Sequence, residues 1–530
     1  MPSNDSSQKT RVAKTCCVCG IDTATIRRVK DIHGNYYCIP CHERLSEAQV
    51  QGASTPSPST RGTSQGSPSA TALQPTRLPG HLKPRVTCPH CWHVFPPEKV
   101  LWVANNDELR GDPVLGSDAY VRFLATRFTV DGHALDARGS ACHHLACPRC
   151  HLTLPRTLLE TEPLFISVVG VPSSGKSYFI TSMTWELRRL LPTQFAIAFS
   201  DADTLSNIFL NENEEKLFLQ NDPNKLVAIE KTEEQGKLYE QIRLGEQNLN
   251  LPKPLLFSLF PASHHPHGTK PAEYGRIVCM YDNAGESFGA GKDIASSPVT
   301  QHLGRARILF FLYDPTQDPR FCDLCRQFSG DPQVKDKVRT HRQETILTET
   351  AMRVRRYTGQ PSNKKYDRPL VVVVPKLDIW EGLLKTPVGP DPIVPAVAGP
   401  QHVAAVDAAR VEQVSAQVRG LLLQITPEFV YAAEEFCQNV VYIPVSALGC
   451  TPQPMGDKSL KGGGLGVSPK DIRPRWITVP FLYMFAKWSS GLIGPSRRPA
   501  SADQPGLKTN SSVAGAPASQ AADNSARATG

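Results

Sequence analysis

The segment Gly170-Val-Pro-Ser-Ser-Gly175-Lys176-Ser177 has the spacing G-x-x-x-x-G-K-[ST]. The apolar run Leu164 to Gly170 before it predicts a buried strand, and Ser177 to Leu191 after it predicts a helix. Glycines permit a tight turn, so that backbone N–H groups and the positive end of the helix converge on an anion. Lys176 is expected to contact the β- and γ-phosphates, and Ser177 to ligate Mg²⁺. The sequence therefore predicts a phosphate-binding loop made by Gly170, Ser173, Ser174, Gly175, Lys176, Ser177 and Tyr178.

Short apolar runs alternate with helical stretches in the region that follows. The expected strands after the first are 255–260, 276–281, 308–313, 369–374 and 440–445, and the expected helices are 177–191, 334–357 and 404–423. Strands that alternate with helices favour a parallel sheet, and runs that are apolar on both faces suit such a sheet. We expect an α/β fold of the P-loop NTPase class, with a mostly parallel sheet and helices on both faces.

The run Val278-Cys-Met-Tyr-Asp282-Asn-Ala-Gly285-Glu286 is a strand that ends in Asp-x-x-Gly. Asp282 at the strand end is placed to hold Mg²⁺, and Gly285 leaves room for a backbone N–H to contact the γ-phosphate. The expected catalytic residues are Lys176, Asp282, Gly285 and Glu286.

Two later strand ends bear on the choice of base. Lys376-Leu-Asp378 follows one strand, and Ser446-Ala447 follows another. The Asp378 carboxylate can accept both N–H donors of a guanine edge while the Lys376 stem lies along the base, and adenine lacks that paired donor face. In isolation, Asp378 could equally be a helix N-cap. In register with the other motifs it predicts guanine recognition, with Ser446 and Ala447 closing the pocket.

These four motifs resemble those of P-loop GTPases of the translation-factor and Ras-like class, over roughly residues 163–488. The resemblance implies that Lys176 and Ser177 bind phosphate and Mg²⁺, and that Asp282 and Gly285 sense the γ-phosphate. It also implies that Asp378 reads guanine and that Ser446-Ala447 closes the base pocket. The cysteine-rich region in front is similar to that of double-GTPase-type proteins found in bacterial conflict or defence gene clusters.

Three departures from that class are visible. Pro375 stands where Asn or Thr is usual, so one side-chain contact between base and phosphate loop is missing. Glu286 stands where many members have Gln, and a carboxylate there predicts slow intrinsic hydrolysis. The threonine that would complete the Mg²⁺ site is Thr232 or Thr269, with Thr232 preferred.

Cysteine pairs predict two structural zinc sites. Cys16, Cys19, Cys38 and Cys41 form a C-x₂-C…C-x₂-C set with 18 residues between the pairs, and Cys17 is a rival ligand. The second set is Cys88, Cys91, Cys147 and Cys150, with 55 residues between the pairs. Cys142, His143 and His144 are rival ligands of this second site. Four thiolates leave no open position for water, so both sites are expected to be structural. Cys322 and Cys325 form a lone pair that we expect to lie in a helix turn rather than on a metal.

Composition separates the remaining segments. We expect a disordered N-terminus (1–14), a zinc ribbon (15–45), a flexible linker (51–82), a second ribbon with an insertion (83–155), the nucleotide domain (163–488) and a disordered tail (489–530). The net charge of +8 over 530 residues does not favour nucleic acid, although it leaves it open. With no apolar run long enough to cross a bilayer and no signal peptide, we expect a cytoplasmic protein with reduced thiols and no membrane contact.

The function that these features predict is a GTP-dependent, Mg²⁺-dependent switch whose zinc modules dock a protein partner. Two alternatives stay open. One is a scaffold that binds nucleotide without hydrolysis while the zinc modules recognise the partner, and the other is an ATPase.

Overall fold

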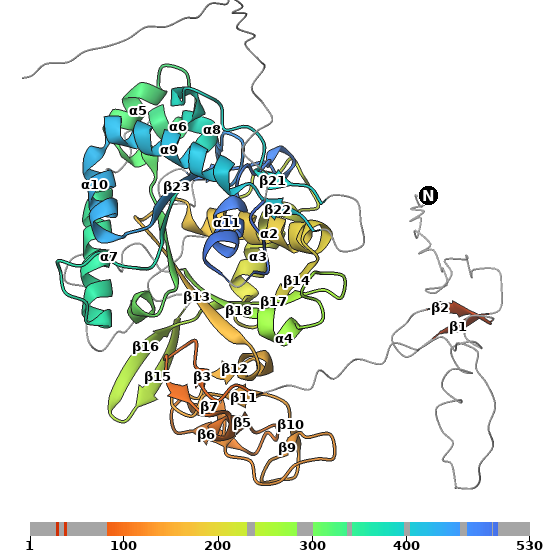
Figure 1. Cartoon of the computed structure of the whole chain (residues 1–530). Coiled ribbons are helices and arrows are strands. Elements are labelled where there is room, and N and C mark those ends of the chain that lie inside the picture. Colours follow the sequence, from red (N-terminus) through yellow and green to blue (C-terminus); the bar gives the residue numbers. More distant parts are fainter. Residues whose placement is uncertain are drawn as a thin grey trace, which may run out of the picture. The chain divides into compact units, whose positions relative to one another are not determined.

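The computed structural model describes residues 28–30, 36–39, 82–229, 239–282, 300–335, 342–396, 403–455, 464–489 and 491–496. The chain divides into two compact units, residues 1–77 and 78–530. The described part of the first unit contains an antiparallel pair of strands, β1 (Arg28–Lys30) and β2 (Tyr36–Cys38). The elements discussed below all belong to the second unit (Figure 1).

A seven-stranded sheet lies at the centre of the second unit, in the order β14-β17-β18-β13-β19-β20-β23. The five strands from β18 to β23 run parallel, whereas β17 is antiparallel to both β18 and β14. The strands are β13 (Glu162–Gly170), β14 (Ile197–Asp201), β17 (Leu255–Pro261), β18 (Arg276–Asp282), β19 (Ile308–Leu312), β20 (Leu370–Val374) and β23 (Val440–Pro444). The expectation of an α/β fold with a mostly parallel sheet is confirmed.

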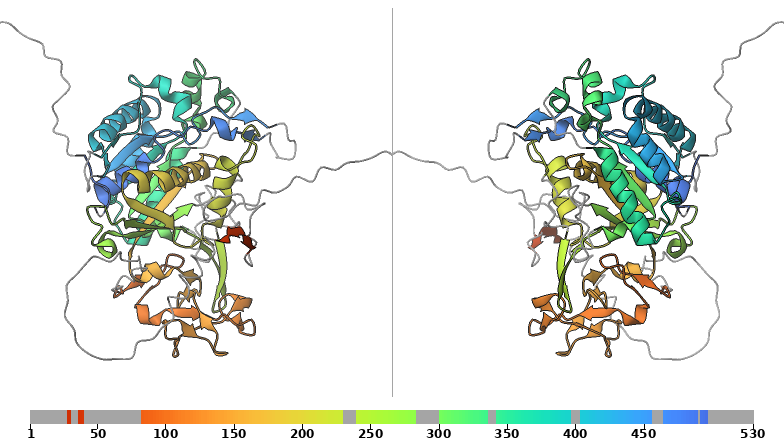
Figure 2. Two further views of the ribbon diagram at one scale, coloured as in Figure 1. Left: turned by 90° about the vertical axis from the view of Figure 1, so that its right-hand side faces the viewer. Right: turned by 90° about the vertical axis from the view of Figure 1, so that its left-hand side faces the viewer.

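Helices cover both faces of this sheet. Figure 2 shows α2 and α3 on one side and α7 on the other. The helices are α2 (Lys176–Gln194), α3 (Ile208–Phe218), α4 (Pro271–Tyr274), α5 (Pro319–Cys325), α6 (Pro332–Lys335), α7 (Gln343–Thr358), α8 (Leu377–Trp380), α9 (Ala408–Ile425), α10 (Pro427–Phe436) and α11 (Val479–Trp488). Within the described ranges, no helix combines the length and the apolar character needed to cross a membrane.

The sequence located the six central strands to within two residues at each end but missed β14. Its residues alternate between buried and exposed, and two of them, Ser200 and Asp201, are polar. Two expected helices had wrong bounds. The stretch 334–357 contains the end of α6 at Lys335 and then α7 from Gln343, and residues 336–341 lie outside the described ranges. The stretch 404–423 begins as β22 (Ala405–Val406), because the Asp407 carboxylate caps α9 by accepting from the Arg410 N–H at 3.0 Å.

Residues 82–159, here called the four-cysteine module, pack against one face of the sheet (Figure 1). Buried side chains of the module, among them Trp92 and Leu158, share a core with Phe165, Ile277 and Tyr281 of the sheet. A hairpin of β15 (Tyr239–Leu244) and β16 (Gln247–Pro252) joins the same core. The module's strands are β3 (Val86–Thr87), β4 (Val94–Phe95), β5 (Leu101–Val103), β6 (Arg110–Asp112), β7 (Gly116–Tyr120), β8 (Arg122–Phe123), β9 (Ala134–Leu135), β10 (Ala141–Cys142), β11 (Leu145–Ala146) and β12 (Thr153–Leu154).

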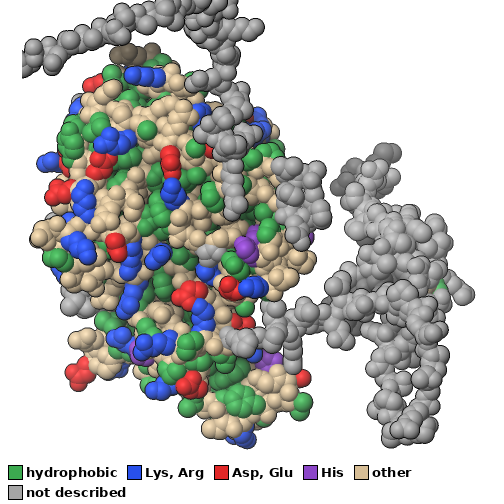
Figure 3. Space-filling view, viewed as in Figure 1, with side chains coloured by type: hydrophobic (Ala, Val, Ile, Leu, Met, Phe, Trp, Pro, Cys, Tyr) green, Lys and Arg blue, Asp and Glu red, His purple; other side chains and the backbone are tan. Residues whose placement is uncertain are grey.

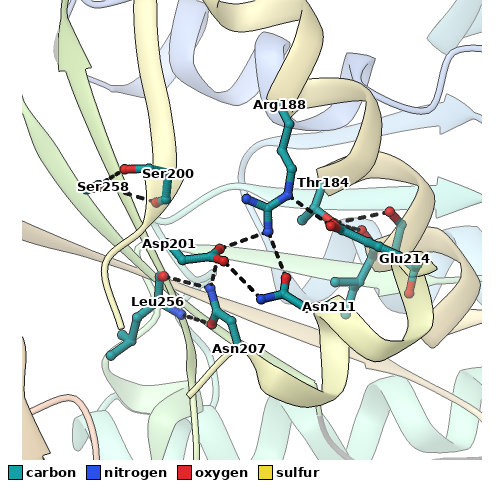
Figure 4. Close-up of polar contacts among 11 residues, drawn as sticks. Thr184, Arg188, Ser200, Asp201, Asn207, Asn211, Glu214, Leu256 and Ser258 are labelled. Carbon is teal, nitrogen blue, oxygen red and sulfur yellow. Dashed lines mark hydrogen bonds and ion pairs between the residues drawn. The ribbon is translucent and has the colours of Figure 1, made fainter. Parts of the chain in front are cut away.

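A largely buried polar network fixes β14 and α3 to the helix that follows the phosphate-loop motif (Figure 4). Arg188 of α2 donates to Asp201 at 2.8 Å, to Asn211 at 3.0 Å and to Glu214 at 2.9 Å. Asn207 donates to Asp201 at 2.8 Å and exchanges two hydrogen bonds with the backbone of β17. Burial raises the pKa of Glu214, and the bond from Arg188 offsets part of that effect. The network therefore ties four elements together through polar contacts, several of them charge-assisted hydrogen bonds, in addition to the apolar core that these elements share.

Candidate functional site

The loop between β13 and α2 carries the segment Gly170 to Ser177. Gly170 ends the strand where a Cβ atom would lie 2.9 Å from the carbonyl oxygen of Leu312 on the neighbouring strand β19. Ser173 and Gly175 have positive φ angles of 61° and 87°. Gly175 is the residue before the first turn of α2. The sequence places glycine at one left-handed position and at one close approach, and both allow the tight turn that it predicted.

Three side chains that are expected to bind phosphate or Mg²⁺ lie beside this loop. Lys176 is buried, and its Nζ donates to the carbonyl oxygens of Gly170 at 3.0 Å and Val171 at 2.9 Å. Asp282 is the last residue of β18, which runs parallel to β13. The Ser177 hydroxyl donates to Asp282 Oδ2 at 3.5 Å. An ammonium group, a hydroxyl and a carboxylate therefore lie together at the carboxyl ends of two adjacent strands.

A cavity lies at the carboxyl ends of the parallel strands, and we call it the carboxyl-end cavity. It has a volume of about 740 Å³, including its open mouth. Three segments that are far apart in the sequence line it: Ser173, Ser174, Gly175 and Tyr178 after β13, Pro375, Lys376 and Asp378 after β20, and Ser446 and Ala447 after β23. Leu448, Leu465 and Val467 add an apolar wall. The structure thus brings together the loop and base-recognition segments that the sequence predicted.

Lys376 is held in a strained backbone conformation by its surroundings. It has a φ of 59° although it is not glycine, and it precedes the short helix α8. Its Nζ donates to Asp314 Oδ2 at 2.7 Å and to Thr316 Oγ1 at 2.8 Å. Strained residues of this kind persist where the surrounding structure fixes them, often at functional sites. The Lys376 side chain is therefore fixed along one wall of the cavity.

Asp378 faces the same cavity and is oriented by Ser446. The Ser446 hydroxyl donates to Asp378 Oδ1 and accepts from the Gly449 N–H at 2.8 Å. Asp378 keeps an exposed surface, which lines the cavity. The cavity walls nevertheless crowd the carboxyl group, and this desolvation raises the pKa of Asp378 in spite of the Ser446 hydrogen bond. A carboxylate that points into a cavity and is oriented from behind can accept hydrogen bonds from a ligand.

Asp314 and Gln317, which follow β19, are two site residues that the sequence did not reveal. Gln317 Nε2 donates to the Pro172 carbonyl oxygen at 2.9 Å and to Asp314 Oδ2 at 3.3 Å. Because Asp314 also pairs with Lys376, a chain of side chains connects the phosphate-loop segment to the segment after β20. The Pro375 side chain has no polar group that could make such a link. The Pro375 carbonyl oxygen accepts from Trp380 Nε1 at 2.8 Å. One sequence signal could have revealed Asp314 and Gln317, because both are polar residues that follow directly after a buried parallel strand.

The structure leaves several other expected site residues untested. Gly285, Glu286 and Thr232 lie outside the described residues. Thr269 is exposed between β17 and α4 and does not line the carboxyl-end cavity. Of the first cysteine set, Cys16, Cys19 and Cys41 lie outside the described residues, and only the backbone of Cys38 is described, at the end of β2.

The second cysteine set forms one buried cluster. The sulfur atoms of Cys88, Cys91, Cys147 and Cys150 all lie within 4.8 Å of one another. The Sγ atoms of Cys88 and Cys150 are 3.7 Å apart, as are those of Cys91 and Cys147. The rival ligands lie elsewhere in the module, and Cys142 Sγ donates to the Ser140 carbonyl oxygen. Four convergent cysteines with this spacing fit a tetrahedral Zn²⁺ site.

The two cysteine pairs adopt the same local geometry. The residue after each pair, Trp92 or His151, has a positive φ angle of 55° or 60°. Each of these residues donates its N–H to the carbonyl oxygen of the first cysteine of its pair at 3.0 Å. A backbone N–H inside each pair also donates to that first cysteine's sulfur at 3.4 Å. Such donors stabilise thiolates, so the backbone is arranged for metal ligation.

The thiols of this cluster have pKa values that are displaced in opposite directions. Burial raises the pKa of Cys88 and of Cys150, whereas hydrogen bonds from the neighbouring thiols lower the pKa of Cys147. A bound divalent cation would stabilise all four as thiolates. The donor set and its burial therefore fit zinc.

Tyr281 connects this cluster to the strand that carries Asp282. Tyr281 is buried, its hydroxyl donates to the Pro89 carbonyl oxygen at 2.5 Å, and it accepts from Trp92 Nε1 at 3.1 Å. Pro89 and Trp92 belong to the first cysteine turn, and Asp282 is the next residue after Tyr281. The turn that carries Cys88 and Cys91 and the end of β18 are thus linked by two hydrogen bonds.

Cys322 and Cys325 lie on one face of α5 and are buried in the main core. Cys322 Sγ donates to the Thr316 carbonyl oxygen at 3.1 Å. They form no part of a cluster of potential metal ligands among the described residues, in agreement with the expected helix turn.

Comparison with known proteins gives a distant relative. No protein-family model matches the chain. The chain is 24% identical over 245 residues to the putative ESX-1 scaffolding and assembly protein SaeC of Mycolicibacterium smegmatis, a match that covers 45% of this chain and 52% of that protein. The chain therefore spans about half the length of this curated relative. A match to the structure of translation elongation factor SelB from Methanococcus maripaludis with the GTP analogue GppNHp has a TM-score of 0.17 and 10% identity, over 54% of this chain and 30% of that chain. That score is too low to support an argument about fold or function.

Proposed function

We propose that the chain binds a guanine nucleotide with Mg²⁺ in the carboxyl-end cavity and acts as a slowly hydrolysing switch. One observation carries the proposal. Segments after β13, β20 and β23, which the sequence assigned to phosphate and base recognition, line one cavity. Ligands of α/β sheets bind at the carboxyl ends of parallel strands, where this cavity lies.

Each end of the cavity suits a different part of the nucleotide. The phosphates would lie against the loop 170–177, where Lys176 exchanges its two carbonyl acceptors for phosphate oxygens. Bound Mg²⁺ would neutralise phosphate charge, and Ser177 and Asp282 are the residues placed to hold it. The Asp378 carboxylate would accept the two N–H donors of guanine, with Ser446 fixing its orientation. Lys376, tied to Asp314, would form the wall beside the base.

The zinc modules would serve the switch as structural and docking parts. Four cysteine ligands close the coordination sphere of the four-cysteine module, so the metal would hold the fold rather than do chemistry. Glu286, which replaces the usual Gln, is the basis for proposing slow hydrolysis. The proposed partner is a protein that responds to the nucleotide state, and the proposed compartment is the cytoplasm, which keeps thiols reduced.

A second candidate function is a scaffold that binds nucleotide without hydrolysing it. The similarity to SaeC favours this candidate, because that protein is described as a scaffolding and assembly protein. In this case the four-cysteine module and its neighbours would recognise the partner, and the nucleotide would stabilise the fold.

Titration of the full chain with labelled GTP and labelled ATP tests these functions. We expect tight GTP binding, its loss in Lys176→Ala, and loss of the GTP preference in Asp378→Ala. Asp323→Asn, an exposed aspartate away from the cavity, is the control and should bind as wild type does. Equal affinity for ATP and GTP would indicate an ATPase, and absence of binding by a folded chain would contradict nucleotide binding. Phosphate release from bound GTP then separates a hydrolysing switch from a scaffold.

A further inference from the structure

A second cavity lies at the opposite edge of the same sheet, and we call it the amino-end cavity. It has a volume of about 1330 Å³, including its open mouth. Four arginines line it: Arg276, Arg305, Arg307 and Arg368. Arg276 begins β18, Arg305 and Arg307 precede β19, and Arg368 precedes β20. Because β18, β13, β19 and β20 are adjacent parallel strands, their amino ends bring these residues to one edge.

The four arginines form no ion pairs within the described residues, and Glu162 acts electrostatically on one of them, Arg276. Arg276 Nη1 donates to two carbonyl oxygens of the turn before β18, and Arg368 Nη1 donates to two just before β19. Glu162 is the one carboxylate that lines the cavity, and Lys83 Nζ already pairs with it. The cavity therefore presents unneutralised positive charge, with half of its guanidinium groups oriented by the backbone.

The width of the cavity restricts the ligand. The distance from β18 to β20 is three strand spacings, or about 14 Å at roughly 4.8 Å per spacing. A single phosphate cannot span that width, whereas an extended peptide places alternate side chains on one side about 6.7 Å apart. Pro163 and Trp488 add apolar surface to the cavity wall.

We propose that the amino-end cavity binds an acidic peptide segment of a protein partner. Carboxylates of the segment pair with the arginines, and an apolar side chain packs against Trp488. The amino-end cavity is separate from the carboxyl-end cavity, and peptide binding there does not depend on a nucleotide.

Charge on the rest of the surface argues against nucleic acid as the ligand. A nucleic acid presents a continuous row of phosphates and is bound by an extended basic surface. Acidic and basic side chains are interspersed over the face in Figure 3, and the net charge of the chain is only +8. A short acidic segment fits the confined basic cavity better.

Fluorescence anisotropy of a labelled ten-residue peptide, alternating Glu and Ala with one central Leu, tests the site on the full chain. We expect binding that weakens with ionic strength, and a loss of affinity of about tenfold or more in Arg305→Gln/Arg307→Gln. Both arginines are exposed, so the variant should fold. Arg156→Gln/Arg189→Gln removes the same charge from side chains that are 69% and 76% exposed outside the cavity, and should stay within about twofold of wild type.

Three results would overturn the proposal. The first is that wild type does not bind the peptide. The second is that both double variants weaken peptide binding equally. The third is that a single-stranded oligonucleotide or inorganic phosphate binds more tightly than the peptide does, and in a way that depends on the arginines. Thermal unfolding checks that the variants are folded. If the double glutamine variant unfolds, the single variants Arg305→Gln and Arg307→Gln take its place, and each should weaken peptide binding more than Arg156→Gln does.

Discussion

The two edges of the central sheet carry cavities with different chemistry. At the carboxyl edge, a lysine, serine hydroxyls and the Asp378 carboxylate line about 740 Å³ of space, open mouth included, with an apolar wall on one side. At the amino edge, four arginines surround about 1330 Å³ with one carboxylate that is already paired. The first arrangement suits a ligand that carries phosphates, a cation and a base. The second suits a partner segment that carries negative charge and an apolar side chain.

The difference follows from how each edge is built. The carboxyl edge is made of loops with special backbone geometry, such as Ser173, Gly175 and Lys376 with positive φ angles. The amino edge is made of ordinary residues directly before strands, and only side-chain identity distinguishes it. A nucleotide site needs backbone N–H groups in a fixed arrangement, whereas an ion-pairing surface needs only charge at a suitable spacing.

The largest expected effect comes from removing the metal of the four-cysteine module, which contacts both edges. Thr87 lines the amino-end cavity, and Pro89 and Trp92 hold Tyr281 beside Asp282. Cys147→Ser should abolish zinc binding by this module, lower the unfolding temperature markedly and weaken both GTP and peptide binding, because metal binding supplies folding energy to small modules. Metal analysis measures the zinc content, and calorimetry measures the unfolding temperature and the binding of both ligands. Cys142→Ser, a buried cysteine outside the cluster, should keep the metal.

Lowering the pH should weaken GTP binding at the carboxyl-end cavity. Because burial raises the pKa of Asp378, its carboxylate is protonated at a higher pH than an ordinary aspartate. Only the ionised form accepts both guanine N–H donors, so GTP affinity is full above this pKa and falls as the pH drops through it. The loss should be about 10- to 100-fold, since hydrogen bonds to charged groups contribute about 1.5–3 kcal/mol. Arginines do not titrate in this range, so their charge at the amino edge does not change.

Affinities measured across acidic pH for wild type and Asp378→Asn check this expectation. The variant should bind GTP weakly and without this pH dependence. A wild-type GTP affinity that stays constant down to about pH 3.9, the ordinary aspartate value, would contradict the assigned role of Asp378.

Tyr281→Phe tests whether the hydrogen bonds between the four-cysteine module and β18 affect the carboxyl edge of the sheet. The change removes two hydrogen bonds and leaves the Pro89 carbonyl and the Trp92 indole N–H without their partner. We expect a loss of stability of about 1–3 kcal/mol and a weaker Mg²⁺ dependence of nucleotide binding, because Asp282 follows Tyr281. Tyr442→Phe on β23, whose hydroxyl bonds to Glu434 at 3.2 Å, is the control. Equal changes in Mg²⁺ dependence for both variants would rule out the link.

The smallest expected effect is that of Gln317→Ala. Its amide connects the Pro172 carbonyl to Asp314, and through Asp314 to Lys376. Loss of that link should weaken GTP binding by about 0.5–1.5 kcal/mol and leave peptide binding unchanged. Isothermal titration measures both ligands. Gln220→Ala, an exposed side chain at the end of α3, should change neither, and a similar loss of GTP affinity there would show that the Gln317 effect is unspecific.

The sequence indicated the central strands and the site segments because both leave local signals. A run such as Leu370–Val374 is apolar at every position, which a strand buried on both faces requires. The spacing of Gly170, Gly175 and Lys176, and the spacing of the two cysteines within each pair, reflect geometry within a few residues. β14 escaped detection because it is short and buries only two apolar side chains, Ile197 and Phe199, while its last two residues, Ser200 and Asp201, are polar.

By itself, the sequence determined the α/β class, three of the segments that line the carboxyl-end cavity and one set of converging cysteines. The three segments meet because parallel strands bring their carboxyl ends to one edge. Only the tertiary structure decided which residues complete those sites. Tyr281 meets Trp92 across 189 positions in the chain, and Gln317 meets Pro172 across 145. The four arginines of the amino edge likewise come together only through strand order. No local pattern encodes such pairs, because they depend on how distant elements pack.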